Sequence, residues 1–278
     1  MLARFLILVV TATMASAALT TASAADSSAT TAALDAALAA PTRSAENRSR
    51  DVYRHPGETL EFFGFRPDMT VIELWAGGGW YTEILAPALR HSGRLIVTTY
   101  GETDDPEAYR TKSHRMLVEK LAKAPDVYDE VELLTFWPPA ADSLGESASA
   151  DLIVTFRNIH SMTRRGQQQA FFAAAYDVLK PGGVLGIVQH RASEGVDPVE
   201  NADKGYIPQS NVVSLAEDAG FRLDGTSEIN ANAKDTRDYP EGVWTLPPRL
   251  RSKDPDKSRF IAIGESVRMT LRFVKPAG

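Results

Sequence analysis

The stretch from residue 70 to residue 85, TVIELWAGGGWYTEIL, restricts the possible folds more than any other part of the chain. Val71, Ile72 and Leu74 form a short, partly β-branched apolar run that is typical of a buried parallel strand. The glycines at 77–79 then allow backbone conformations and close approaches that a Cβ would block. The residues after them have the apolar spacing of an amphipathic helix. A strand, a glycine turn and a helix present backbone N–H groups to a ligand, which predicts a small-molecule pocket and favours a nucleoside.

The composition of the chain excludes several classes of protein and of chemistry. With 44% hydrophobic and 24% charged residues among 278, the chain is an ordinary globular protein with a substantial core. The net charge of −6 and the lack of a long Lys/Arg block argue against nucleic acid as a partner. Because the chain has no cysteine, disulfides, thiolate catalysis and Cys-ligated zinc are excluded.

The N-terminus has the pattern of a secretory signal. Arg4 precedes the apolar run FLILVV, and a small-residue stretch ends in the motif ASA at residues 22–24. We therefore predict a signal peptide over residues 1–24, cleaved after Ala24, with the ASA motif at residues 15–17 as the alternative site. The apolar run is shorter than the ~20 residues of a membrane-spanning helix, which favours a cleavable signal over an anchor. The expected location is periplasmic or secreted, without stable membrane insertion after cleavage.

The rest of the chain is divided into a linker and one domain. Residues 25–43 are rich in Ala, Ser and Thr and are predicted to be a linker, either a tether or a weak helix. Residues 44–278 are predicted to be a single domain in which strands alternate with helices, as in a parallel sheet covered on both faces. The last two strands lack a strong helix between them, so we expect them to pair antiparallel, with the final strand at an edge. The predicted strands are 71–74, 94–99, 131–136, 151–156, 184–189, 221–229 and 267–274.

Three motifs in order resemble a known superfamily. They are ELWAGGG at residues 73–79, DLIV at residues 151–154, and LKPGG at residues 179–183 before a strand. Together they resemble the class I S-adenosylmethionine-dependent methyltransferases. That resemblance implies a Rossmann-like α/β fold: a seven-stranded, mostly parallel sheet with helices on both faces and an antiparallel last strand. The segments GGGWYTEILAP, QHRA and DYPEGVWTLPP resemble, more narrowly, a family of exported predicted methyltransferases.

The resemblance also implies a cofactor and the residues around it. Glu73, Gly77 and Gly79 would lie beside the methionine part of S-adenosyl-L-methionine, with Gly78 and Tyr81 completing the cofactor-binding set. Glu73 would order the glycine loop and meet the ammonium group of the ligand, directly or through water.

Two positions depart from the superfamily pattern. Trp75 stands where the first glycine is usual, so the turn there must accept a Cβ and a large ring. The end of the second strand, Thr98 to Tyr100, lacks the acid that normally holds both ribose hydroxyls. A carboxylate accepts two O–H donors at once, which Thr99 cannot do, and Glu102 in the next loop is the nearest replacement.

Candidate catalytic residues follow the fourth and fifth strands. Ligands in such sheets bind beyond the carboxyl ends of the strands, where Arg157, His160, His190 and Arg191 are expected. Methyl transfer needs an aligned acceptor, and a base if that acceptor carries a proton; His160 or His190 is the candidate base. Arg157 or Arg191 is the candidate partner of an acidic substrate. The alternative is that these side chains hydrogen-bond loop backbone or form ion pairs. No HExxH-like pair or dense carboxylate cluster is present, so we predict no metal.

These patterns favour one function and leave alternatives open. The favoured function is an exported S-adenosylmethionine-dependent methyltransferase acting on an unidentified small molecule. The alternative is a non-catalytic exported small-molecule-binding protein on a methyltransferase-like scaffold, which Trp75 and Thr99 favour; a third is an enzyme of another class using the histidines as acid and base. An insertion at residues 230–264 is expected to form either a lid or wall of the acceptor pocket or a tether packed on the sheet edge.

Overall fold

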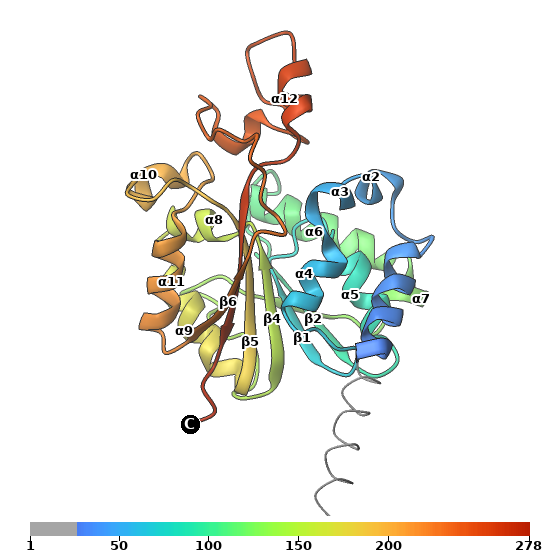
Figure 1. Ribbon diagram of the computed structural model, residues 1–278. Helices are drawn as coiled ribbons and strands as arrows, with labels where there is room; N and C mark the ends of the chain where they lie inside the picture. Colours follow the sequence, from blue (N-terminus) through green and yellow to red (C-terminus); the bar gives the residue numbers. More distant parts are fainter. Residues whose placement is uncertain (1–26) are drawn as a thin grey trace, which may run out of the picture.

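The computed structural model describes residues 27–278, and the predicted signal peptide, residues 1–24, lies outside the described residues. The strands form one seven-stranded sheet in the order β3-β2-β1-β4-β5-β7-β6 (Figure 1). They are β1 (Thr70–Leu74), β2 (Arg94–Thr99), β3 (Glu132–Thr135), β4 (Ala150–Phe156), β5 (Leu179–His190), β6 (Arg222–Ser227) and β7 (Arg268–Val274).

The strand directions confirm the predicted fold class. β1 lies between β2 and β4 and is parallel to both, with Val71 opposite Leu95 on one side and Leu152 on the other. β3 and β5 extend the parallel part of the sheet, and β7 is antiparallel to both β5 and β6. This is a Rossmann-like sheet with the reversed final strand that the sequence predicted.

The prediction that the final strand lies at an edge is wrong. β7 is inserted between β5 and β6, and β6 is the edge strand. Polar and apolar residues alternate in β7, a pattern typical of a strand with one solvated face. Its polar Thr270 is instead buried and accepts a hydrogen bond from Asn230 Nδ2 at 2.9 Å, so the polar face is covered by other chain segments.

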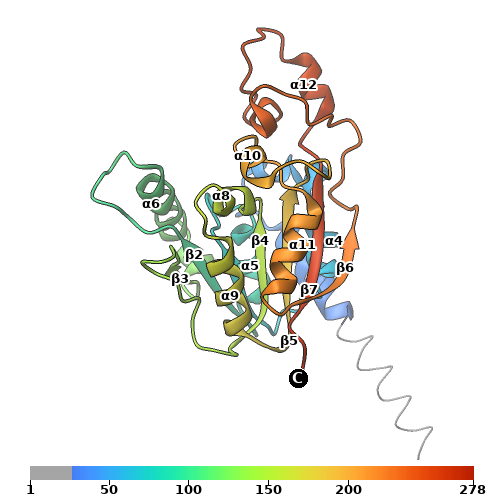
Figure 2. The same cartoon turned by 90° about the vertical axis from the view of Figure 1, so that its left-hand side faces the viewer.

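Helices cover the two faces of the sheet in separate layers. In Figure 2, α9 and α11 lie on one side of the sheet and α4 and α5 on the other. The helices are α2 (Ala45–Arg48), α3 (Asp51–Arg54), α4 (Pro56–Phe62), α5 (Thr82–Leu89), α6 (Tyr109–Ala122), α7 (Pro125–Tyr128), α8 (Ile159–Thr163), α9 (Gln168–Val178), α10 (Pro198–Ala202), α11 (Gln209–Asp218) and α12 (Ser258–Ile263), with a 3-10 turn, η1 (Gly242–Thr245).

Alternating side chains of the central strand supply both halves of the core. Ile72 packs in the cluster that contains Phe171 of α9, whereas its neighbour Val71 packs in the cluster that contains Ile84 of α5. Successive side chains of a strand point to opposite faces, so one apolar run serves two helical layers.

Residues 27–39, within the predicted linker, are helical and packed on the domain. Leu34 and Ala37, three residues apart and therefore on one helical face, are buried in the same cluster as α4 and α5. Arg43 continues this attachment through a two-pronged ion pair with Asp51, at 2.7 and 2.8 Å. Within residues 27–278, no helix combines the length and the apolar character required to cross a bilayer.

Several chain segments meet at one rim of the sheet. The parallel strands end at the same rim, beside α2 and α3, and the segment with η1 and α12 rises above it (Figure 1). Chain segments from both ends of the domain therefore meet where the carboxyl ends of β1, β4 and β5 open.

Candidate functional site

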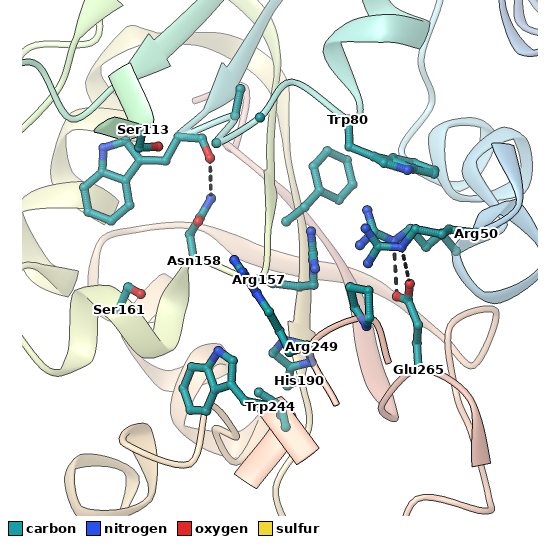
Figure 3. A pocket seen from close by; sticks show the side chains of 18 of the residues that line it. Arg50, Trp80, Ser113, Arg157, Asn158, Ser161, His190, Trp244, Arg249 and Glu265 are labelled. Carbon is teal, nitrogen blue, oxygen red and sulfur yellow. Dashed lines mark hydrogen bonds and ion pairs between the residues drawn. The ribbon is translucent and has the colours of Figure 1, made fainter. Parts of the chain in front are cut away.

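A cavity of about 660 Å³ lies at this rim. Its size is in the range of small-molecule sites, and its walls come from the glycine loop, α3, α6, the ends of β4 and β5, and the segment before β7. The residues that border it and enter the argument below are Arg50, Arg54, Trp75, Gly77, Gly78, Tyr100, Arg157, His160, His190, Trp244, Arg249, Glu265 and Ser266. Figure 3 labels six of them: Arg50, Arg157, His190, Trp244, Arg249 and Glu265.

The glycine loop borders the cavity through two of its three glycines. Gly77 has φ +59°, and a Cβ added there would meet nothing within 4 Å, so it faces open space. Gly78 also borders the cavity. Gly79 turns away: a Cβ on it would come within 3.0 Å of Leu117 of α6, so its role is close packing of loop against helix.

Two residues of the predicted cofactor set are turned into the protein. The Glu73 carboxylate is 2% exposed and accepts a hydrogen bond from Thr82 Oγ1 at 2.6 Å, and burial raises its pKa to about 7. Tyr81 stacks on Phe156 with ring centroids 3.4 Å apart. Neither Glu73 nor Tyr81 is among the described residues that border the cavity. Glu73 orders the junction of the loop and α5, and Tyr81 supports the loop from behind.

Trp75 occupies the first-glycine position in the left-handed conformation, with φ +46°. Its indole Nε1 donates to the carbonyl oxygen of Phe136 at 2.8 Å, and its ring packs on Tyr100 with centroids 4.9 Å apart. The backbone N–H donates to Thr98 Oγ1 at 2.9 Å. The turn thus accepts a large ring because the indole lies across the ends of β2 and β3. Trp75 and Tyr100 both border the cavity, so the indole forms a wall of it and leaves it open.

The end of β2 presents no carboxylate to the cavity among the described residues that border it. Thr99 Oγ1 is engaged by His114 Nδ1 at 2.9 Å and by the backbone N–H of Gly101 at 3.1 Å. Glu102 points to Arg115 instead, 3.1 Å away. The ribose-holding acid that the superfamily pattern calls for therefore has no replacement at this place.

The three predicted catalytic residues all border the cavity. The rings of His160 and His190 have centroids 5.9 Å apart, one from α8 and one from the end of β5. His190 Nδ1 shares a hydrogen bond with the Ser266 hydroxyl, and His160 Nδ1 lies 3.4 Å from Gln189 Nε2. Arg191, in contrast, pairs with Glu228 at 2.6 Å and does not border the cavity.

Both histidines are uncharged at neutral pH. Burial, reinforced by the neighbouring cation Arg164, lowers the pKa of His160 to about 3. Burial and the proximity of His160 hold the pKa of His190 well below its usual value. Neutral imidazoles can accept a proton, but at such low pKa values they are weak bases until an anion approaches.

Arg157 stands at the carboxyl end of β4 in a strained conformation. Its φ is +65°, and its backbone N–H donates to the carbonyl oxygen of Val188 at 2.6 Å. Its guanidinium makes no hydrogen bond or ion pair with any residue in the range 27–278. Burial lowers the pKa of this group to about 10, which leaves it charged at neutral pH.

Sequence reasoning missed a cluster of arginines around one carboxylate. Arg50 Nε and Arg54 Nε lie 2.6 and 3.1 Å from the two carboxylate oxygens of Glu265, and Arg268 Nη1 lies 3.3 Å away. Figure 3 shows Arg50 and Glu265 facing each other across the cavity wall. A signal for half of it was present, since Arg50 and Arg54 are four residues apart and share a face wherever that segment is helical. Their partner is 215 residues away from Arg50 in the chain, which no local pattern reveals.

The insertion at residues 230–264 supplies one wall of the cavity. Trp244 and Arg249 border it, and the His160 ring meets the Trp244 indole edge to face with centroids 5.8 Å apart. Of the two roles expected for this segment, the structure has the wall. Among residues 27–278 no group of three or more His, Asp or Glu side chains is arranged to hold a metal ion.

The strand order, the glycine loop after β1 and the cavity at the carboxyl rim define the fold of the S-adenosylmethionine-dependent methyltransferases. Solved structures agree. A SAM-dependent methyltransferase from Aquifex aeolicus is 17% identical, with a TM-score of 0.55 over 82% of this chain and 93% of that one. A putative sarcosine dimethylglycine methyltransferase from Galdieria sulphuraria is 16% identical, with a TM-score of 0.55 over 84% and 88%.

The same fold also carries a different chemistry among the similar structures. The (4+2)-cyclase SpnF is 16% identical, with a TM-score of 0.53 over 81% of each chain. No known family profile and no curated protein matches this sequence. At these identities the likeness shows the fold alone, and function has to be argued from the cavity.

Proposed function

We propose that this protein is an exported S-adenosylmethionine-dependent methyltransferase that acts on a small molecule. The observation that carries the proposal is the open cavity in front of Gly77, at the place where this fold binds its ligands. When bound, the cofactor would supply an activated methyl group. A Cβ at Gly77 would project into the cavity, so the absence of a side chain leaves the backbone there open to a ligand. The amides of Gly77 and Gly78 would hold the methionine part of the cofactor.

The aromatic wall fits the other end of the cofactor. Trp75 and Tyr100 border the cavity on the β2 side and offer ring surfaces on which an adenine can stack. The transfer itself needs little beyond alignment of acceptor and methyl group. His160 and His190 are placed to accept a proton from the acceptor, and Trp244 of the insertion packs edge to face on the His160 ring.

A second candidate function is non-catalytic binding of a small molecule on the same scaffold. Two observations favour it: the ring of Trp75 replaces the first glycine, and the end of β2 has no acid for the ribose hydroxyls. The cyclase among the similar structures supports the general point that this fold carries other functions.

Ligand-induced stabilisation separates the two candidates. S-adenosylmethionine or S-adenosylhomocysteine at a hundred times its dissociation constant should stabilise the fold by about 2.7 kcal/mol, measured as a rise in melting temperature. No rise with either compound at millimolar concentration would contradict the methyltransferase proposal and leave the binding protein.

Alanine substitutions at Gly77 and Gly182 provide a test variant and a matched control. Gly77→Ala adds a methyl group to the cavity at φ +59°, whereas Gly182→Ala adds one at φ +80° in equally open space, in the turn at the start of β5. Both variants bear a similar backbone cost of about 1–2 kcal/mol. Only Gly77→Ala should lose the stabilisation by S-adenosylhomocysteine; equal losses in both would place the ligand elsewhere.

Export is tested on the mature protein. N-terminal sequencing of material from the periplasm or the medium should begin near Ala25. A soluble cytoplasmic protein that retains Met1 would contradict this part of the proposal.

A further inference from the structure

We propose that the arginine cluster, defined as Arg50, Arg54, Arg157 and Arg268 around Glu265, is an oxyanion subsite that holds a carboxylate or phosphate group of the substrate. The identification of that substrate as the methyl acceptor rests on the proposed function, whereas the anion subsite itself does not.

The first argument is the charge imbalance. Three guanidinium groups share one carboxylate, the fourth has no ion-pair partner, and Glu46, the other acid that borders the cavity among the described residues, is exposed. Arg54 and Arg268 are 2% and 3% exposed. Buried charges in proteins are normally paired, because an isolated one loses its hydration. An anionic ligand would restore the balance.

Unpartnered donors give the second argument. Arg54 Nη1 and Nη2 and Arg50 Nη2 are buried and have no hydrogen-bond partner among residues 27–278. A buried N–H left unpaired costs about 1–3 kcal/mol, and more on a charged group. The Nη pair of a guanidinium matches the two oxygens of a carboxylate or phosphate. Arg54, whose guanidinium carbon lies 4.5 Å from the centroid of the Trp80 ring, keeps both Nη atoms without a hydrogen-bond partner in the described chain.

Arg157 supplies the third argument, since it faces the cavity with its charge unused. It is less deeply buried than Arg54 and borders the cavity at the end of β4. A left-handed conformation costs an arginine about 1–2 kcal/mol, and such strain clusters at active sites and ligand-binding segments. Arg157 is therefore the direct contact, with Arg54 and Arg50 behind it.

The position of the cluster assigns the anion to the substrate. It lies at β4 and β7, on the other side of the glycine loop from Trp75 and Tyr100, where the nucleoside is expected. His190 and Ser266 border the same part of the cavity. An anion held there would lie beside the neutral imidazole and favour its protonated form, which would make it a better base.

Two simple oxyanions test the subsite without knowledge of the natural ligand. Phosphate and malonate are titrated into the full mature chain by calorimetry and thermal unfolding, with sodium chloride at matched ionic strength as the baseline. Saturable binding of phosphate, of malonate or of both is the expected result, and the preferred anion identifies the source of the charge. Absence of binding by both overturns the proposal.

Variants at one position and a remote control locate the binding. Arg157→Gln should weaken oxyanion binding at least about tenfold, which corresponds to about 1.4 kcal/mol. Arg157→Lys keeps the charge and should recover most of the affinity. The control Arg222→Gln removes an exposed arginine on β6 that pairs with Asp224, outside the cavity, and should bind as the wild type does. Equal affinities of wild type, Arg157→Gln and Arg222→Gln would overturn the proposal.

A pair of nucleosides distinguishes the substrate from the cofactor. S-adenosylhomocysteine carries a carboxylate and 5′-methylthioadenosine does not. If Arg157→Gln weakens the binding of S-adenosylhomocysteine but not that of methylthioadenosine, the cluster serves the cofactor and the assignment to the substrate is overturned. If both nucleosides bind unchanged while oxyanion binding is lost, the assignment stands. Oxyanion binding without nucleoside binding would refute the proposed function and leave the subsite intact.

Discussion

The two halves of the cavity are built on different principles. On the β1–β2 side, aromatic rings pack closely and polar atoms are paired: Trp75 Nε1 with Phe136 and Thr99 with His114. On the β4–β7 side, Arg157 has no partner and Arg54 keeps two buried nitrogens unpaired within the described chain. The β1–β2 side resembles a protein core, and the β4–β7 side contains charged groups without partners.

This difference separates support from recognition. A packed aromatic wall is stable without a ligand and offers a surface for any flat ring. A cluster of like charges destabilises the ligand-free fold, and a bound anion offsets this destabilisation. Such a cluster is therefore expected where an anion binds. The specificity of this protein is therefore expected to reside in the arginine cluster rather than in the glycine loop.

The largest expected effect comes from removing the carboxylate at the centre of the cluster. Glu265→Gln leaves Arg50, Arg54 and Arg268 without their shared partner and should lower the free energy of unfolding by about 3–5 kcal/mol. The same arginines hold the pKa of Glu265 at about 2 although burial alone would raise it. Urea denaturation measures the loss.

An exposed ion pair is the control for this experiment. Glu228→Gln removes a carboxylate that pairs with Arg191 and is 67% exposed, and it should cost less than about 1 kcal/mol. Similar losses of stability in the two variants would mean that the carboxylate of the cluster contributes no more than one in an exposed ion pair. That result would contradict the contrast between the two halves of the cavity.

The next effect is a pH dependence on the packed side. The pKa of Glu73 is about 7 in the folded protein because of burial, against 4.5 for the free group. The protonated carboxyl therefore stabilises the fold fully below about pH 4.5, and this contribution, about 3 kcal/mol, is lost as the pH rises through 7. Glu73→Gln keeps an acceptor for Thr82 and should remove this part of the dependence. Parallel stability curves of wild type and variant between pH 4.5 and 8 would contradict it.

A smaller loss is expected at the aromatic wall. Trp75→Gly deletes a buried indole, which costs about 3–5 kcal/mol, and relieves a left-handed conformation worth about 1–2 kcal/mol. The net loss of stability should be about 2–3 kcal/mol by urea denaturation. Unchanged stability would show that the indole is not part of the packed half. A tightening of S-adenosylhomocysteine binding would show that the indole restricts the nucleoside.

The smallest effect has the opposite sign. Arg157→Asn replaces a strained, unpaired cation by a residue that tolerates φ +65° and should raise the free energy of unfolding of the ligand-free protein by about 1 kcal/mol. The gain should come with lost oxyanion binding, as expected where stability is sacrificed for function. A loss of stability greater than about 1 kcal/mol would mean that Arg157 supports the fold.

Much of the fold could be predicted because its signals are local. The apolar run 71–74 and the glycines after it predicted β1 and its loop, and the lack of a strong helical pattern between the last two strands predicted the antiparallel pairing of β6 and β7. The place of β7 inside the sheet could not be predicted, since burial of Thr270 depends on Asn230. Tertiary contacts decide which polar faces are covered.

For the site, residue types and strand ends alone determined that Arg157, His160 and His190 would meet near a glycine loop. Only the tertiary structure decided that Glu73 and Tyr81 turn inward, and that Arg50 and Arg54 close on Glu265. The physical reason is range: hydrophobic period and turn chemistry act over a few residues, whereas an ion pair forms between any segments that folding brings together.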